Sequence, residues 1–136
     1  KLLLKRADEI FKDKIKDKKI SFLGVTFKAN TDDMRDSSSL IMIPSLSKKV
    51  AHIRYFDPTG QKKEFDKYKN VNYINSLEKC IDKADLVIIH TEWNDFKSIN
   101  FRNLAKSKKF IIFDMRNIYS ASKIKTQGFK YFSVGR

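Results

Sequence analysis

Short apolar runs alternate with longer amphipathic stretches along most of this chain. The short runs have the length of β-strands, and the longer stretches have the apolar spacing of helices. The pattern predicts strands at residues 19–25, 52–56, 71–74, 86–90, 110–114 and 131–134. It predicts helices at residues 38–50, 76–83, 101–107 and 121–126, with a short turn near residues 62–67.

Two of the runs are apolar throughout, residues 86–89 (Leu-Val-Ile-Ile) and residues 110–113 (Phe-Ile-Ile-Phe). Such runs are typical of central parallel strands that are covered on both faces. Regular alternation of strands and helices favours an open sheet with helices on either side. We therefore expect an α/β fold, a Rossmann-like, doubly wound, mostly parallel sheet of about six strands.

Residues 1–15 differ from the rest, because their apolar positions follow helical spacing with charges between them. We interpret them as the end of a helix that connects this domain to an upstream one, and the chain as a fragment of a longer polypeptide. Residues 16–136 form the predicted domain, which no linker or internal repeat interrupts. A chain of 136 residues is long enough for one self-sufficient core.

Cysteine usage and hydropathy bear on the cellular compartment of the protein and on its association with membranes. The single cysteine, Cys80, cannot form an internal disulfide, and its amphipathic surroundings favour a small buried hydrophobe over a reactive thiol. The sequence has no signal-peptide pattern and no apolar run of membrane-spanning length. We expect a cytoplasmic location and no membrane partner.

The formal net charge of +13 raises the possibility of a nucleic-acid partner, because cationic surfaces attract polyanions. The charge comes mainly from lysines spread along the chain, without an arginine-rich helix or a nucleic-acid motif. We expect no nucleic-acid partner. A basic binding module stays the alternative from a different class, and its affinity would fall steeply with salt.

The turn after the first predicted strand contains Gly24 but lacks the G-x-G-x-x-G pattern that lets the backbone approach a pyrophosphate. The chain is therefore a poor candidate for holding NAD by itself. Asp57, at the end of the second strand, could act as the ribose-binding acid of such a fold. The sequence Asp57-Pro58-Thr59-Gly60 is more simply interpreted as a turn.

Residues that could contact a ligand follow three of the predicted strands where each strand ends. Phe27 and Lys28 follow the first strand, residues 91–93 follow the fourth, and Asp114 to Arg116 end the fifth. In a doubly wound sheet, ligands bind beyond the carboxyl ends of the strands. A lysine and an arginine at one such edge indicate a phosphate or nucleotide site.

Three blocks in order carry a family resemblance: residues 24–36 (GVTFKANTDDMRD), 90–96 (HTEWNDF) and 113–119 (FDMRNIY). They resemble the C-terminal, UDP-binding domain of UDP-glucose 6-dehydrogenases, in the UDP-glucose/GDP-mannose dehydrogenase family. The resemblance covers essentially the whole chain. Ala29 stands where many members have proline, and Ser37-Ser38 where Ala-Pro is common.

The resemblance implies roles for individual residues. Phe27 and Lys28 would lie against the nucleotide sugar, Arg116 would contact it, and Arg35 would reach NAD on the N-terminal domain. The residues themselves leave other interpretations open. Phe27 could pack in the core, and Arg35 could form a local salt-bridge network with the aspartates of its loop. The serines at positions 37–39 are interpreted as helix caps.

The resemblance also implies the activity of the whole enzyme. Such enzymes oxidise UDP-glucose twice with NAD to give UDP-glucuronate for polysaccharide synthesis, through a cysteine in an N-terminal Rossmann domain. This chain would then hold no catalytic residue, would be inactive alone, and would pair with that domain and form a homodimer. GDP-mannose and UDP-N-acetylhexosamines remain alternative substrates. Two histidines without a third ligand at metal spacing do not predict a metal site.

Overall fold

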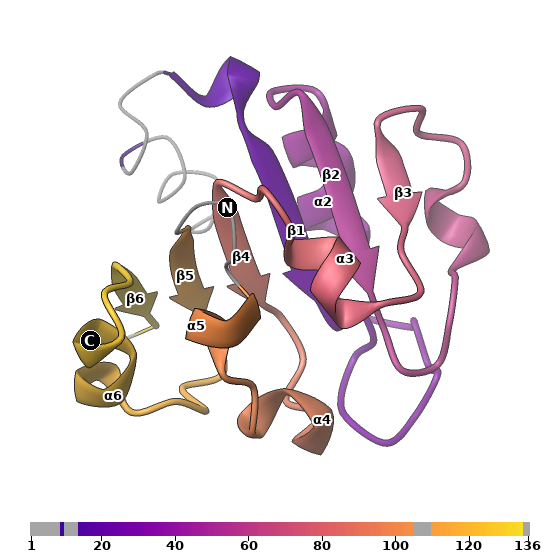
Figure 1. Ribbon diagram of the computed structural model, residues 1–136. Coiled ribbons are helices and arrows are strands. Elements are labelled where there is room, and N and C mark those ends of the chain that lie inside the picture. The colour runs from indigo at the N-terminus through magenta and orange to yellow at the C-terminus, as the bar shows by residue number, and fades with distance from the viewer. Residues whose placement is uncertain (1–8, 10–13, 105–109, 135–136) are drawn as a thin grey trace.

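The computed structural model describes residues 9, 14–104 and 110–134. Within this part of the chain, parallel strands form one six-stranded sheet in the order β3-β2-β1-β4-β5-β6 (Figure 1). The strands are β1 (Lys19–Leu23), β2 (His52–Phe56), β3 (Val71–Tyr73), β4 (Leu86–Ile89), β5 (Ile111–Asp114) and β6 (Tyr131–Ser133). The predicted fold class, a Rossmann-like doubly wound sheet, is confirmed.

The helices cover both faces of the sheet. They are α2 (Ser39–Ser47), α3 (Leu77–Ile81), α4 (Asn94–Lys97), α5 (Phe101–Leu104) and α6 (Ala121–Thr126), with 3-10 turns η1 (Ile15–Asp17) and η2 (Lys63–Phe65). In Figure 1, α2 lies behind the sheet and α3 and α5 lie in front of it. Among the described residues, no helix is long and apolar enough to cross a membrane.

Alternate side chains of each central strand enter two separate cores, because successive residues of a strand point to opposite faces. Phe22 and Ile88 pack with Ile43 of α2 in one core, and Leu23 and Ile89 pack with Ile81 of α3 in the other. All four residues of β4 are buried. Burial on both faces explains why the run from Leu86 to Ile89 has no polar alternation.

Several predicted boundaries were wrong. The first strand ends at Leu23, two residues early, and α2 spans only Ser39–Ser47. The four-residue helix α4 was not predicted, and its N-cap residue, Trp93, makes no side-chain capping bond that could mark its start. The predicted helix at residues 1–15 lies almost wholly outside the described residues, and Ile15 belongs to the 3-10 turn η1. The domain division stays a prediction.

Gly24 ends β1 and turns the chain out of the sheet. Its φ is +80°, a conformation that residues with a side chain rarely adopt. A Cβ atom at this position would lie 2.5 Å from Cβ of Thr91, the second residue after β4. Glycine is therefore required both by the backbone turn and by the close approach of the loop after β4.

Gly24→Ala is expected to destabilise the domain more than Gly60→Ala. Gly60 also has a positive φ, +96°, but an added Cβ would meet nothing within 4 Å. The backbone conformation should cost both variants roughly 1–2 kcal/mol, and the clash with Thr91 should cost Gly24→Ala roughly 1–3 kcal/mol more. Urea denaturation measures both losses. Equal losses would contradict the close packing of Gly24 on Thr91.

Candidate functional site

The loops that follow β1, β4 and β5 leave the sheet at the same edge. The three strands are parallel neighbours, in the order β1-β4-β5, so that their carboxyl ends lie side by side. Figure 1 shows the arrowheads of the strands and the loop of residues 24–38 at this end of the molecule. We call this edge, with residues 24–38, 90–93 and 115–118, the rim.

Hydrogen bonds join the three loops of the rim. The Thr91 hydroxyl, in the loop after β4, donates to the Thr26 carbonyl at 3.0 Å. Nε of Arg116, in the loop after β5, donates to the His90 carbonyl at 2.9 Å. The loop that carries Lys28 is thus tied to Thr91, and the loop that carries Arg116 is tied to the adjacent residue, His90.

A buried carboxylate shapes the loop of Arg116. Asp114 is fully buried, and one of its oxygens accepts the Arg116 N–H at 3.0 Å. The other accepts the Tyr119 N–H at 3.0 Å and the Tyr131 hydroxyl at 2.7 Å. Nε of Arg116 is taken by the His90 carbonyl. Its two terminal nitrogens have no recorded partner within the described residues, so these forked donors are available to an anion.

Lys28 lies in the loop after β1 and is exposed. Its carbonyl accepts the Thr26 hydroxyl at 3.0 Å, and the Phe27 N–H donates to the Asp33 carbonyl at 3.0 Å, which fixes the backbone on either side. No hydrogen bond or ion pair of the ammonium is recorded within the described part of the chain. Phe27 is 46% exposed, which argues against the interpretation that it packs in the core.

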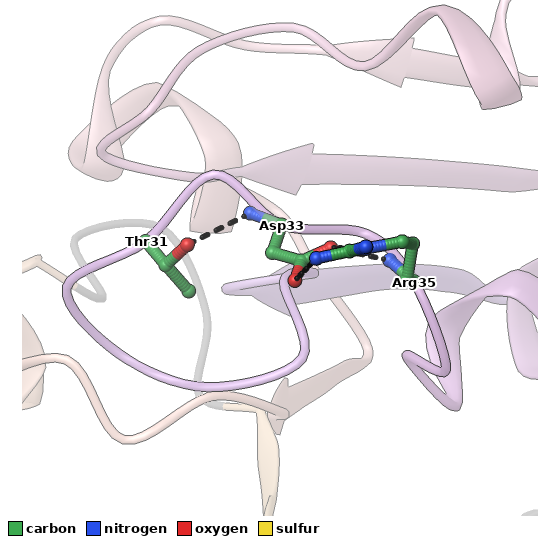
Figure 2. A network of polar contacts seen from close by, with 3 residues as sticks. All are labelled: Thr31, Asp33 and Arg35. Carbon is green, nitrogen blue, oxygen red and sulfur yellow. Dashed lines mark hydrogen bonds and ion pairs between the residues drawn. The ribbon is translucent and has the colours of Figure 1, made fainter.

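Arg35 already has a partner (Figure 2). Its Nε and one terminal nitrogen donate to the two carboxylate oxygens of Asp33 at 3.1 and 3.0 Å. The bond from Arg35 is the main reason that the pKa of Asp33 lies below its ordinary value. Thr31 supports the pair, because its hydroxyl accepts the Asp33 N–H. The predicted local salt bridge is therefore present.

The pair leaves part of the guanidinium free. Two of its five N–H donors point to Asp33, and the Arg35 side chain is 88% exposed. Arg35 lines an open hollow of about 480 Å³ between residues 32–35 and residues 61–64. It can therefore donate to a further anion while it remains paired.

Asp57 has a structural role. It is fully buried, and one oxygen accepts the Val25 N–H at 2.9 Å. The other accepts the N–H and hydroxyl of Thr59 at 2.9 and 2.6 Å. These bonds hold the turn after β2 against the start of the loop after β1. Of the two interpretations of Asp57, the structure favours the turn.

The predicted capping of α2 by the serines at positions 37–39 is present only in part, because the Ser37 hydroxyl accepts the Ser39 N–H at 3.3 Å. Ser38 occupies the N-cap position but makes no side-chain capping bond. The hydroxyls of Ser37 and Ser39 each donate to the Val25 carbonyl at 2.6 Å. The Ser38 hydroxyl lies 2.9 Å from Nε2 of His90. The serines therefore anchor α2 to the rim, which a capping pattern in the sequence could not distinguish.

His90 was missed as a member of the rim. It is fully buried, and its Nδ1 lies 2.9 Å from the Thr91 hydroxyl. Burial, with a smaller contribution from the charge of Arg116, lowers the pKa of His90 to about 3. Its place directly before the Thr-Glu-Trp sequence was the available signal, but a polar residue that ends an apolar run did not by itself indicate a role.

Cys80 lies outside the rim, in α3. Cys80 is fully buried, and burial raises the pKa of its thiol to about 12, as expected for a structural cysteine. Its carbonyl accepts the Ser21 hydroxyl on the α3 face of the sheet. Within residues 9, 14–104 and 110–134, no cluster of three histidine, cysteine or acidic side chains could hold a metal ion.

The model of one known protein family matches most of this chain. Residues 21–121 match the model of the UDP binding domain of the UDP-glucose/GDP-mannose dehydrogenase family. The match covers more than half of the chain and includes all three loops of the rim. The chain belongs to this family.

Curated relatives carry the name UDP-glucose 6-dehydrogenase. The protein of Rickettsia bellii is 34% identical over 98% of this chain, and that of Rhizobium meliloti is 35% identical over 90% of it. The chain spans only 32% and 28% of the length of these two relatives. The matched region is therefore about a third of each relative or less.

Solved structures of similar fold are also dehydrogenases. The UDP-D-ManNAc dehydrogenase of Pyrococcus horikoshii has a TM-score of 0.77 and is 32% identical, over 98% of this chain and 29% of that one. An NDP-N-acetyl-D-galactosaminuronic acid dehydrogenase from Methanosarcina mazei has a TM-score of 0.80 over 99% of this chain and 28% of that one. At 22% identity, the second shows the fold alone.

The buried His90 is expected to make the domain less stable in mild acid. In the unfolded chain the histidine is protonated below about pH 6.5, whereas in the folded chain it stays neutral down to about pH 3. The free energy of unfolding therefore decreases as the pH is lowered from 6.5 towards 3. Between pH 6.5 and 5.0 the loss from this group should be roughly 2 kcal/mol, at about 1.4 kcal/mol per pH unit.

Urea denaturation at pH 7.5 and 5.0 measures this loss. His90→Asn should lose less stability between the two pH values than the wild type, by that amount. His52→Asn controls for the removal of an imidazole, because His52 is only half-buried. The same pH dependence in His90→Asn as in the wild type would contradict a neutral, buried His90.

Proposed function

We propose that this chain is the nucleotide-sugar-binding domain of an NAD-dependent UDP-glucose 6-dehydrogenase, which oxidises UDP-glucose to UDP-glucuronate in two steps. The observation that carries the proposal is the placement of two available cations on loops tied to one residue pair. Lys28 follows Thr26, which accepts a bond from Thr91, and Arg116 donates to His90. Family membership and the names of the relatives support this choice of ligand.

The chemistry of the two cations suits a diphosphate. Lysine carries a compact charge that can sit between several oxygens, and arginine offers a planar fork that matches a phosphate group. The buried acids of this edge, Asp57 and Asp114, are satisfied by neighbouring donors. The exposed ring of Phe27, next to Lys28, offers an apolar surface to the nucleotide sugar.

NAD would be held mainly by a separate N-terminal Rossmann domain. The turn at Gly24 lacks the glycine pattern for a pyrophosphate, and the Asp57 carboxylate is occupied inside the fold. Arg35 fits a supporting role, because its side chain is largely exposed and lines an open hollow. NAD would supply the hydride acceptor, and Arg35 would orient it from this side.

The catalytic thiol would also lie in the N-terminal domain. Cys80 is a buried residue of α3 with a raised pKa, so it suits packing and not nucleophilic attack. This chain would therefore bind the nucleotide sugar without turning it over. We further propose that the whole enzyme is a homodimer that supplies polysaccharide synthesis and lies in the cytoplasm. The single free cysteine, Cys80, agrees with that compartment.

A second substrate is supported by one comparison. The UDP-D-ManNAc dehydrogenase of Pyrococcus horikoshii is about as similar to this chain as the UDP-glucose 6-dehydrogenases are. Lys28 and Arg116 would grip the diphosphate that both substrates share. Substrate profiling of the full-length enzyme with UDP-glucose, UDP-N-acetylhexosamines and GDP-mannose distinguishes the candidates.

The proposal predicts UDP binding that depends on both cations. Lys28→Ala and Arg116→Ala should each weaken UDP binding by roughly tenfold to one hundredfold, because each removes a charge-assisted bond. Isothermal titration calorimetry measures the affinity. Lys48→Ala is the matched control, because Lys48 is an exposed lysine at the far end of α2.

Equal UDP affinity in the wild type and both rim variants would contradict the assignment. Tight, salt-sensitive binding of DNA or RNA without binding of UDP would favour the basic module instead.

Arg35→Ala in the full-length enzyme should raise the KM for NAD by about tenfold, because a guanidinium bond to an anionic cofactor is lost. The KM for UDP-glucose should stay within about twofold of the wild-type value. Steady-state kinetics with each substrate varied in turn measures both constants, and Lys48→Ala is again the control. An unchanged KM for NAD would contradict a contact between Arg35 and NAD and would leave Arg35 only its ion pair with Asp33.

A further inference from the structure

The donor and acceptor roles of the hydrogen bonds around His90 can be assigned. The Thr91 hydroxyl donates its hydrogen to the Thr26 carbonyl, so its oxygen must accept the hydrogen bond that it shares with Nδ1 of His90. His90 is then the neutral tautomer with its proton on Nδ1, and Nε2 accepts from the Ser38 hydroxyl. A single polar chain leads from Ser38 through His90 and Thr91 to Thr26.

Both ends of this chain reach groups that carry the proposed binding site. Thr26 precedes Lys28 by two residues, and its hydroxyl holds the Lys28 carbonyl. On the other side, the His90 carbonyl accepts Nε of Arg116. His90 therefore contacts one loop through its ring and Thr91, and the other loop through its backbone.

The fold alone does not require a polar ring here. The four residues of β4 before His90 are all apolar and buried, and Phe22 lies next to the ring, with centroids 6.3 Å apart. An apolar residue could fill this space, whereas a buried polar ring is acceptable only where its hydrogen bonds are made. Both recorded ring bonds of His90 go to residues at the rim.

On the basis of the proposed function, we infer that His90 is a positioning residue for nucleotide-sugar binding. Its ring and carbonyl hold the loops of Lys28 and Arg116 in a fixed relative placement, so that both cations meet one diphosphate. These hydrogen bonds raise the affinity through preorganisation, because a rim that is ordered before binding loses less conformational freedom when the ligand binds. His90 itself does not touch the ligand.

The test compares UDP affinity, measured by titration calorimetry, in variants of this chain. His90→Phe removes both ring bonds and should weaken UDP binding by about tenfold. Thr91→Val removes the hydroxyl at similar volume and should do the same. His90→Asn should recover most of the affinity, because its amide nitrogen can replace the Nδ1 donor to Thr91.

Ser21→Ala is the control for a merely structural effect. It removes another buried bond, from the Ser21 hydroxyl to the Cys80 carbonyl at 2.6 Å, on β1 but away from the rim. Thermal unfolding measures the stability lost by each variant. Ser21→Ala should lose stability and keep wild-type UDP affinity, whereas His90→Phe should lose both.

A double-mutant cycle with Lys28→Ala tests whether His90 acts through the rim. Without the cation of Lys28, adding His90→Phe should weaken binding by much less than tenfold, because the loop it positions no longer carries a charge. Fully additive losses of UDP affinity in the double variant would overturn the positioning role, and so would equal UDP affinity in His90→Phe and Ser21→Ala. Either result leaves the proposed function standing if Lys28→Ala and Arg116→Ala still weaken UDP binding. Absence of UDP binding by the folded wild type would overturn both.

Discussion

The hydrogen bond from the Thr91 hydroxyl to the Thr26 carbonyl is the contact on which the site depends. It joins two loops that come from neighbouring strands and brings the loop of Lys28 to the end of β4. The bond is possible because Gly24 has no side chain, since a Cβ atom there would overlap Thr91. A turn with positive φ, a close approach and a hydroxyl thus act together to form the rim.

Acidic and basic side chains have different roles at this edge of the sheet. Asp57 and Asp114 are buried at the ends of β2 and β5, where they accept backbone and hydroxyl donors and shape the loops. Asp33 pairs with Arg35. The carboxylates therefore organise the backbone, and the positive ends of Lys28 and Arg116 remain available. Within the loop of residues 24–38, the charge of Asp33 is thus neutralised by Arg35.

The sequence predicted the fold well because its strongest signals were long and regular. The buried runs at residues 86–89 and 110–113 mark strands that pack on both faces, and all six strands lie near their predicted places. Element ends were less predictable, since the end of β1 depends on a contact between Gly24 and Thr91, which are far apart in sequence. The short helix α4 has no capping bond that a sequence could signal.

The positions of the candidate residues on their strands could be predicted, and the hydrogen bonds between them less so. Lys28 and Arg116 stand out as cations at strand ends, and the structure places their loops at one edge. The partner of Arg35 was among the interpretations considered. The bonds of His90 and Ser38 could not be predicted, because they join residues 52 positions apart whose side chains meet only in the folded chain.

The central claim is that Lys28 and Arg116 bind one diphosphate together. A crystal structure of this chain with UDP tests it most directly. The account predicts that Nζ of Lys28 and the terminal nitrogens of Arg116 each lie about 3 Å from oxygens of the same diphosphate. UDP bound away from the rim, or in contact with neither cation, would contradict it.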